Sequence, residues 1–381
     1  MVVLIAGGFV LLVLLLSIML GKRNKLYADE YLILYLSFAT LRQIYVYLEY
    51  SGLLQQSYWM LLGKGIYLLH APFFFLYIFA LTQQRRLMWK YYVFLFAPFA
   101  AYTIHFFYYY FWVFDVVKLS TEQGLLFING ELSWSWLIFV VLFLIIEPIY
   151  LILSYVLLRR YRKQLLESVS AMDRINLNWL NVLLFFWLVS AILLIPIGTM
   201  TVSWGWVSTS LMEMLIEVVS VIFFFVIGFY GFKQTTIFTN LELNVALAEK
   251  TMAGNYGRSG LSPEQAKEHH VQLLQLMVEK KPWLNGELTA GELSQLLGVS
   301  TNHLSQILNK EQRQNFFDFI NNYRVKEVIR KMEDPTNDHL TLLAIALDSG
   351  FNSKTSFNTV FKKIIHQTPS HYYRSLERKT S

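Results

Sequence analysis

Long apolar runs fill the first 232 residues of the chain and do not occur in the remainder. A helix that crosses a membrane needs about 20 mostly apolar residues. Seven stretches have that length and character: 2–20, 30–50, 58–82, 91–114, 135–158, 179–202 and 208–232. The second stretch is the least apolar of them, because Arg42 and Glu49 interrupt it. The pattern predicts a seven-helix transmembrane bundle over residues 1–232.

Positive charge is confined to every second loop between these stretches. The loops after the first, third and fifth stretches hold Lys22, Arg23, Lys25, Arg85, Arg86, Lys90, Arg159, Arg160, Arg162 and Lys163. The alternate loops are nearly free of Lys and Arg, and the longest of them, at 115–131, has only Lys118. Cytoplasmic loops carry an excess of Lys and Arg. We therefore expect a protein of the bacterial inner membrane with its N-terminus outside and its C-terminal domain in the cytoplasm.

Beyond residue 232 the pattern changes to short amphipathic helices with charges throughout. We expect a linker at 233–267 and a soluble helical domain at 268–381, so that the fold class is all-α. Thr289 and Glu292 have the spacing of a capping box, and Asp334–Pro335 is a helix stop. The predicted helices of the domain are 268–281, 289–297, 301–310, 315–332, 341–349, 354–365 and 369–376.

Two segments of this domain repeat one plan. Each has an apolar helix, a glycine turn and a second helix whose apolar stripe can pack back on the first. The turns are Gly298–Ser300 and Gly350–Ser353, and each ends on a serine that is suited to cap the next helix. This plan is typical of helix-turn-helix motifs.

Small polar side chains occupy the outward face of the second helix in each repeat. Amides and hydroxyls suit the base edges in a major groove, where Asn or Gln can bond adenine through two hydrogen bonds. At any one position an ordinary solvated helix face would look the same, but two matching faces on two matching repeats favour DNA binding. The candidate base-reading residues are Asn302, Ser305, Gln306, Asn309, Lys354, Thr355 and Asn358.

The end of the chain is basic. Residues 353–381 hold six Lys and Arg against one acid, Glu377, although the net charge of the whole chain is only +6. Cations beside a reading helix supply phosphate contacts, which position a protein on the duplex. The candidate phosphate contacts are Lys362, Lys363 and Arg374.

Four stretches closely resemble the DNA-binding domain of the AraC/XylS family. They are LSQLLGVSTNHLSQILN (293–309), FFDFINNYRV (316–325), LTLLAIALDSGFNSKTSFNTVFKK (340–363) and QTPSHYYR (367–374). The resemblance implies seven helices, with a long central helix near 315–332 that joins two reading units. It also implies that both recognition helices enter the major groove on one face of the duplex, about one helical turn apart. AraC-like proteins with several membrane spans have this overall plan.

One position departs from the family pattern. His366 stands where the family commonly has a glycine that ends the second recognition helix. A left-handed histidine is unfavourable, so we expect this helix end to differ.

Ionisable residues inside the predicted spans are candidates for signal binding, because such residues are rare in membranes. Glu213 and Glu217 share one helix face, where they would repel each other unless a cation such as Arg42 or Lys64 lies between them. An outward-opening polar pocket for a small signal molecule would explain the set; the alternative is that these residues pack between helices or reach toward the membrane surface. The candidate signal-binding residues are Arg42, Lys64, His105, Glu147, Glu213 and Glu217.

The sequence also argues against several function classes. It has no cysteine, which excludes disulfides and thiolate metal sites, and it shows no HExxH, GxSxG or paired-carboxylate pattern. We expect no cofactor and no enzyme activity. The prediction is a DNA-binding transcription regulator, anchored in the lipid bilayer and controlled by an unknown small-molecule or membrane signal. We also expect a homodimer, because tethering two domains raises the effective concentration on double-stranded DNA. The alternative is a membrane transporter or enzyme bundle with an accessory DNA-binding tail.

Overall fold

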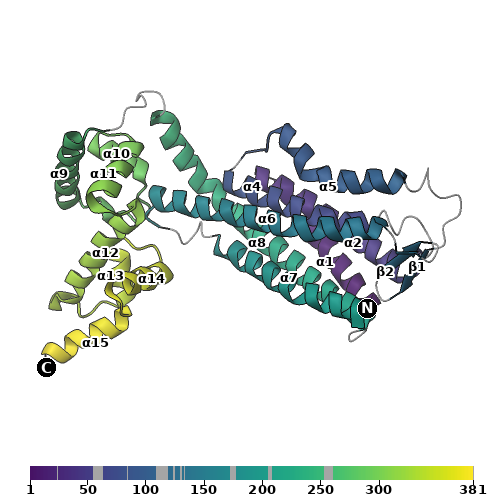
Figure 1. The fold of residues 1–381 in the computed structure, drawn as a ribbon. Coiled ribbons are helices and arrows are strands. Elements are labelled where there is room, and N and C mark those ends of the chain that lie inside the picture. Colours follow the sequence, from purple (N-terminus) through teal and green to yellow (C-terminus); the bar gives the residue numbers. More distant parts are fainter. Residues whose placement is uncertain are drawn as a thin grey trace. The chain divides into compact units, whose positions relative to one another are not determined.

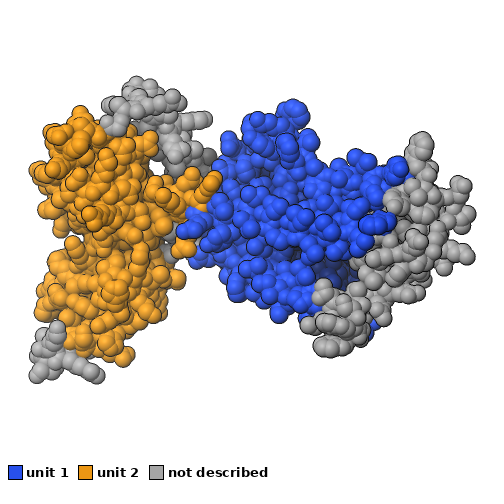
Figure 2. Space-filling view, in the orientation of Figure 1, with its two compact units in different colours: residues 1–159, 177–236 blue, residues 160–176, 237–381 orange. Residues whose placement is uncertain are grey.

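The chain divides into two compact units, residues 1–159 with 177–236 and residues 160–176 with 237–381 (Figure 2). The computed structural model describes all residues except 24, 55–62, 84, 109–118, 123–124, 129–130, 133, 172–176, 205–207, 253–260 and 381. The second unit therefore includes a short segment, 160–176, from the part of the sequence in which the membrane spans are expected.

The first unit is built of long apolar helices (Figure 1). Three of them, α5, α6 and α7, contain an internal proline. α6 continues ten residues beyond the predicted span, to Ser168. The elements are α1 (Val2–Leu20), α2 (Tyr27–Tyr50), η1 (Gly65–Leu69), α4 (His70–Gln83), α5 (Trp89–Tyr108), α6 (Trp134–Ser168), α7 (Asn178–Trp204) and α8 (Thr209–Met252).

Six helical stretches among the described residues are long and apolar enough to cross a membrane. The sequence predicts seven. The difference is α5, which lies at the predicted span 91–114 but is not among these six; residues 109–114 of that span lie outside the described residues. The six are Val2–Leu20, Tyr27–Tyr50, Gly65–Gln83, Leu137–Ser168, Asn178–Ile197 and Ser210–Lys233.

A small antiparallel sheet accompanies the helices, and the fold is otherwise all-helical, as the sequence predicts. Its strands are β1 (Leu119–Glu122), β2 (Leu125–Ile128) and β3 (Glu131–Leu132), in the order β1-β2-β3. Leu119 pairs with Ile128, and Phe127 pairs with Leu132. The strands fall in the longest predicted loop, where the run from Leu125 to Ile128 is too short for a helix but long enough for a strand.

The predicted linker at 233–267 is helical over much of its length. α8 continues without a break to Met252, and α9 (Pro263–Lys280) begins five residues before the predicted helix at 268. The start of α9 is fixed by Ser262, whose hydroxyl accepts a hydrogen bond from the Gln265 backbone N–H at 3.2 Å. The Gln265 side chain in turn accepts from the Ser262 N–H, which completes a capping box.

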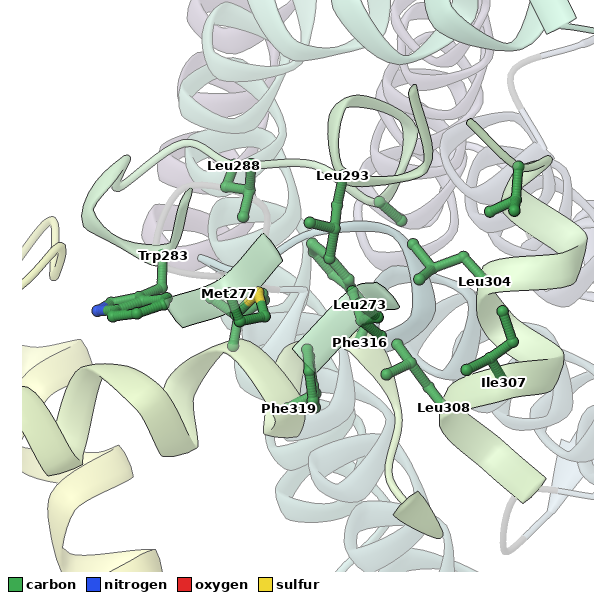
Figure 3. Close-up of a cluster of buried hydrophobic side chains, with 13 residues drawn as sticks. Leu273, Met277, Trp283, Leu288, Leu293, Leu304, Ile307, Leu308, Phe316 and Phe319 are labelled. Carbon is green, nitrogen blue, oxygen red and sulfur yellow. The ribbon is translucent and has the colours of Figure 1, made fainter. Parts of the chain in front are cut away.

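The second unit has two hydrophobic cores that share α12 (Phe316–Met332). Figure 3 shows the first core, in which α9, η3 (Pro282–Leu284), α10 (Ala290–Leu297) and α11 (Thr301–Ile307) pack on the start of α12. Leu273, Leu293 and Ile307 are fully buried there. Removing such a side chain typically costs about 2–5 kcal/mol.

The second core lies against the end of α12. It is formed with α13 (Leu342–Asp348), α14 (Lys354–Ile365) and α15 (Pro369–Thr380), and the buried aromatic rings of Phe351, Phe357 and Phe361 pack in series within it.

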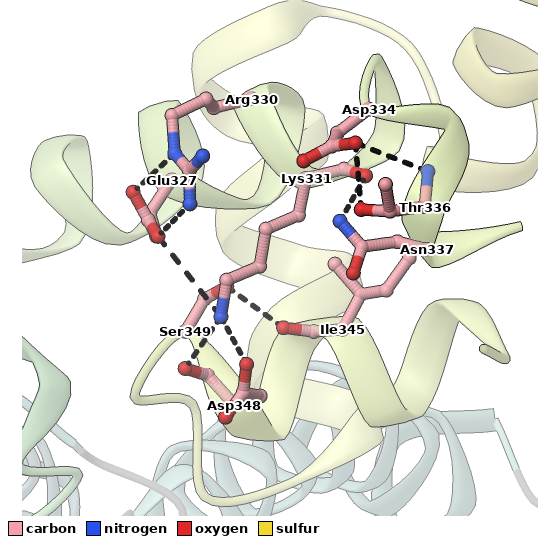
Figure 4. A network of polar contacts seen from close by, with 9 residues as sticks. All are labelled: Glu327, Arg330, Lys331, Asp334, Thr336, Asn337, Ile345, Asp348 and Ser349. Carbon is pink, nitrogen blue, oxygen red and sulfur yellow. Dashed lines mark hydrogen bonds and ion pairs between the residues drawn. The ribbon is translucent and has the colours of Figure 1, made fainter.

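A polar network closes the outer side of the second core (Figure 4). Lys331 of α12 forms an ion pair with Asp348 at the end of α13 and also donates to the Asp348 carbonyl at 3.0 Å. The preceding residue, Arg330, donates two hydrogen bonds to Glu327, which hold the pKa of that carboxyl below its usual range. The network joins the end of α12 to the end of α13.

Candidate nucleic-acid interface

The first helix pair consists of α10 and α11. α10 begins at a capping box in which Thr289 and Glu292 exchange hydrogen bonds, as the sequence predicts. It ends at Gly298, which has the left-handed conformation (φ 76°). The Ser300 hydroxyl then accepts from the His303 N–H at 3.2 Å and starts α11. The turn therefore follows from one residue without a Cβ and one capping hydroxyl.

The second helix of this pair is shorter than predicted. The sequence predicts a helix at 301–310, whereas α11 ends at Ile307 and continues as a π turn at Leu308–Gln312. Arg313, in the left-handed conformation, closes the turn. Asn309 therefore lies on the π turn and not on α11.

The second helix pair consists of α13 and α14. Gly350 is left-handed (φ 91°), and the Ser353 hydroxyl caps α14 by accepting from the Ser356 N–H at 3.1 Å. α14 has the predicted bounds, 354–365. At its end His366 adopts the left-handed conformation (φ 60°) and donates its N–H to the Lys362 carbonyl at 3.0 Å. The expectation of a different helix end is therefore wrong, because the histidine takes the conformation that glycine usually supplies.

The candidate base-reading residues differ in the exposure of their side chains and in their hydrogen bonds. Asn302, Asn309, Lys354, Thr355 and Asn358 are exposed. Ser305 and Gln306 are half-buried, and the Gln306 side-chain oxygen accepts from the Leu261 N–H at 3.4 Å. On the first pair the exposed candidates are thus fewer than the sequence pattern suggests.

The candidate phosphate contacts lie beside α14. Lys362, Lys363 and Arg374 are exposed, but Lys363 forms an ion pair with Asp318 of α12 at 2.6 Å. A shallow hollow opens between the end of α14 and the first turn of α15. It is lined by Asn358, Thr359, Lys362, Lys363, Thr368, Pro369 and Ser370. A helix N-terminus with nearby cations favours a negatively charged oxygen.

A buried arginine that sequence reasoning missed holds the two pairs together. Arg324, at the middle of α12, is 1% exposed. It donates to the carbonyl of Trp283 at 2.9 Å and to that of Asn285 at 2.8 Å. Burial lowers the pKa of its guanidinium to about 10, so the group still carries its charge at neutral pH. The available signal was its spacing, because Ile320, Arg324 and Val328 lie four residues apart on the buried face of α12.

The loop that Arg324 holds also contacts the second pair. The Asn352 side chain donates to the Gly286 carbonyl at 2.9 Å, and a Cβ at Gly350 would clash with the Trp283 carbonyl. The stretch from Trp283 to Gly286 therefore touches both α12 and the turn of the second pair. These contacts fix the relative orientation of α11 and α14.

In the first unit the ionisable candidates separate into pairs. Arg42 donates to Glu217 at 3.0 Å, and Gln43 donates to the same carboxylate at 2.6 Å. Lys64 pairs with Glu49, and His70 lies 3.8 Å from Glu147. A cation thus meets Glu217 as predicted, but neither Arg42 nor Lys64 forms an ion pair with Glu213 among the described residues. His105 lies half-buried on α5, and Glu213 is exposed near the start of α8.

The comparisons with known proteins point to the same region. Residues 293–375 match the family described as a helix-turn-helix domain, and this stretch holds both helix pairs and α12. An uncharacterized HTH-type transcriptional regulator of Staphylococcus aureus (strain COL) is 36% identical over 86 residues, which are 23% of this chain and 11% of that protein. HTH-type transcriptional regulator GlxA of Rhizobium meliloti (strain 1021) is 25% identical over 138 residues, 36% of this chain and 39% of that protein. No solved structure matches the chain.

The second unit thus contains a helix-turn-helix domain of the kind found in transcription regulators, and the relatives are regulators and not enzymes. The matched part of the chain spans only about a tenth of the length of the Staphylococcus relative.

Proposed function

We propose that this chain is a transcription regulator, anchored in the bacterial inner membrane, that binds double-stranded DNA through two helix-turn-helix motifs, α10–α11 and α13–α14. The observation that carries the proposal is the repeated arrangement on one scaffold helix. Both pairs have a left-handed glycine turn, a serine-capped second helix and exposed polar side chains on that helix. Two motifs on one rigid scaffold can read two neighbouring stretches of major groove.

The chemistry of the exposed face supports DNA as the partner. Asn302 and Asn358 can each bond a base edge, and Lys362 beside the first turn of α15 is suited to a phosphate oxygen. The proposed base-reading set remains the exposed residues Asn302, Asn309, Lys354, Thr355 and Asn358, with Ser305 and Gln306 contributing if the Gln306 side chain leaves the Leu261 N–H.

A selection from random duplexes tests DNA binding. The full-length chain in detergent micelles is expected to enrich a defined sequence. A double variant, Asn302→Ala with Asn358→Ala, should lose that preference at about 1–3 kcal/mol for each good contact. The matched control is Gln275→Ala, which removes an exposed amide of α9 away from both pairs. No enrichment by the wild-type chain would reject the proposal.

The outer surface of the first unit supports membrane anchoring. The most apolar window of α1 is only 28% buried in the protein, and the same fraction holds for the window of α6. Large apolar side chains such as Val10, Leu41, Ile152, Val182 and Phe185 are exposed. A water-soluble surface rarely carries so much contiguous apolar area, and a lipid bilayer would cover it.

The proposed topology has seven spans, with α5 as the fourth. The positive loops then face the cytoplasm, the N-terminus lies outside and the DNA-binding domain lies inside. A C-terminal alkaline phosphatase fusion, which is active only outside the cytoplasm, should be silent, whereas a β-galactosidase fusion at the same site should be active. The opposite pattern would overturn both the topology and the regulator function.

We further propose that the bundle senses a signal and that two copies act together on DNA. A ligand can shift the bundle only if it binds two arrangements with different affinity. Arg42, Glu217 and Gln43 are placed to respond, because their buried hydrogen bonds join α2 to α8. Glu217→Gln should abolish the response of a target promoter while membrane insertion stays normal, and Glu213→Gln, at an exposed position that forms no ion pair with the described residues, serves as the control. An unchanged response in Glu217→Gln would leave this pair as a packing contact.

A further inference from the structure

The end of α6 and the two residues that follow it are bound to the DNA-binding unit. Val169 and Ser170 are 4% and 1% exposed. Val169 forms an antiparallel bridge with Thr289, the cap residue of α10. The Ser170 N–H donates to the Leu288 carbonyl at 3.3 Å. The chain at this point is therefore paired with the backbone that leads into the first helix pair.

Every polar group of Ser170 has a partner in this unit. Its hydroxyl donates to the Leu288 carbonyl at 2.7 Å and accepts from Arg324 at 2.9 Å. Its carbonyl accepts from Arg324 at 3.0 Å and from Asn321 at 3.1 Å. Hydrogen bonds from a charged donor are the stronger kind. A small hydroxyl residue is thus held between α12 and the start of α10.

The same segment also reaches the second helix pair. Leu166, two residues before the end of α6, packs against the second core. Arg324 itself lies with its guanidinium carbon 6.0 Å from the ring centre of Phe351 in the turn of that pair. The segment Leu166–Ser170 therefore contacts both halves of the domain at the point where they join.

Asn321 and Arg324, which bind this segment, would lose hydrogen-bond acceptors if the segment dissociated. Arg324 donates hydrogen bonds to five acceptor atoms on four residues, and Ser170 supplies two of those atoms. A buried guanidinium without those acceptors is unfavourable. The reading residues Asn302 and Asn358 remain exposed while the segment is bound. Docking therefore supports the joint between the pairs and leaves the reading faces open.

We propose that Leu166–Ser170 is an internal ligand of the DNA-binding domain, and that its docking on Asn321 and Arg324 holds α11 and α14 in the orientation that binds DNA. The inference rests on the proposed function. It makes α6, a helix that continues from the first unit directly into the docked segment, the route by which the bundle controls DNA affinity. Release of Ser170 is the step that weakens binding.

A disulfide test reports docking of the segment on the DNA-binding domain independently of DNA binding. The chain has no cysteine, so Val169→Cys with Thr289→Cys introduces a single possible intramolecular bond. Residues paired in an antiparallel bridge have a Cα separation that a disulfide accepts. Oxidation of the full-length double variant in cell membranes should give an intramolecular bond, and the single variants should not. Failure to form this bond would overturn the docking.

A matched pair of substitutions tests whether docking of the segment changes the affinity for DNA. Ser170→Arg places a second cation against Arg324, whereas Ser168→Arg alters a neighbour whose hydroxyl bonds only the Gln164 carbonyl of its own helix. Affinity is measured for the full-length chain on the duplex that the wild-type chain selects. Ser170→Arg should lower affinity about tenfold, the loss expected when a charge-assisted contact is removed, and Ser168→Arg should leave it unchanged.

Ser170→Ala is a milder variant that keeps the protein folded, because it removes only the hydroxyl and keeps the backbone pairing. It should lower the affinity for DNA by less than Ser170→Arg does. Equal affinities for wild type, Ser170→Ala and Ser170→Arg, with the disulfide formed, would overturn the coupling and leave DNA binding intact. If the wild-type chain selects no duplex, the proposed function fails, and the disulfide still reports whether the segment docks.

Discussion

The two helix pairs make the same turn in different surroundings. A Cβ at Gly298, in the first pair, would meet no atom within 4 Å, whereas one at Gly350, in the second, would meet the Trp283 backbone and the Arg324 side chain. The second helices differ in length. α11 has seven residues and then a π turn, while α14 has twelve residues. The first pair thus has a loose turn and a short reading helix, and the second has a tight turn and a long one. The comparison suggests that the second pair carries more of both the stability and the base reading.

The largest expected effect concerns the residue that joins the pairs. Arg324→Met removes five hydrogen bonds and leaves the Trp283 carbonyl buried without its donor. We expect the free energy of unfolding of the second unit to fall by about 4 kcal/mol, since removing one partner of a buried charged contact costs about 3–5 kcal/mol. Pulse proteolysis of the full-length chain in urea measures it. Arg330→Met, whose side chain is 59% exposed, is the control and should cost less than 1 kcal/mol, roughly the worth of a surface ion pair.

The second largest effect on stability is expected from substitutions in the two glycine turns. Gly350→Ala should cost about 3 kcal/mol, because the left-handed conformation is strained and the Cβ also displaces packed backbone. Gly298→Ala should cost about 1–2 kcal/mol, from the strain alone. The same urea measurement compares them. Equal losses would mean that the contact between Gly350 and the Trp283 loop does not hold the pairs together.

Base reading gives a smaller effect. Asn358→Ala should weaken discrimination at its base by about 1–3 kcal/mol, and Gln306→Ala should do so by less, because its amide oxygen already accepts from the Leu261 N–H. Competition binding with single-base variants of the selected duplex measures both. A larger effect at Gln306 would reverse the proposed division of labour between α11 and α14.

The smallest effect separates two neighbouring lysines. Lys362→Ala should lower the slope of log K against log salt by about one, the value for one lost phosphate contact. Lys363→Ala should change the slope less, because Lys363 is paired with Asp318. Titrations at several salt concentrations give the two slopes. Identical slopes would show that the ion pair opens on DNA.

Local signals in the sequence predict much of this domain, since caps and turns depend on neighbouring residues. The bounds of α14, the Ser353 cap and the capping box at Thr289 are all confirmed. The end of α11 could not be predicted, because hydrophobic spacing does not distinguish a π turn from a further α-helical turn. At His366 the sequence shows a residue that is unfavourable in the left-handed conformation, yet the helix ends there with the N–H of His366 bonded to the Lys362 carbonyl.

Contacts between distant parts of the chain could not be predicted at all. Ser170 and Arg324 are separated by 154 residues, and Lys363 and Asp318 by 45. Neither pair has a spacing rule, so Lys363 looks like an available cation in the sequence, and nothing there marks Ser170 as a contact residue. In the first unit, apolar length predicts helices well, but the hydropathy of α5 leaves the number of candidate spans at six among the described residues.

The length of α8 has a consequence for how such a regulator finds its target. The helix has 44 residues, which at 1.5 Å per residue is about 66 Å, and the hydrocarbon core needs only about 30 Å. The part after Lys233, the end of its apolar stretch, is about 28 Å long. With the first unit anchored in a bilayer as proposed, a DNA-binding domain joined to it through this helix would not travel along the chromosome in search of its site. The gene must instead drift to the membrane, so that the distance of a locus from the cell envelope, and not only its sequence, would decide how quickly it responds.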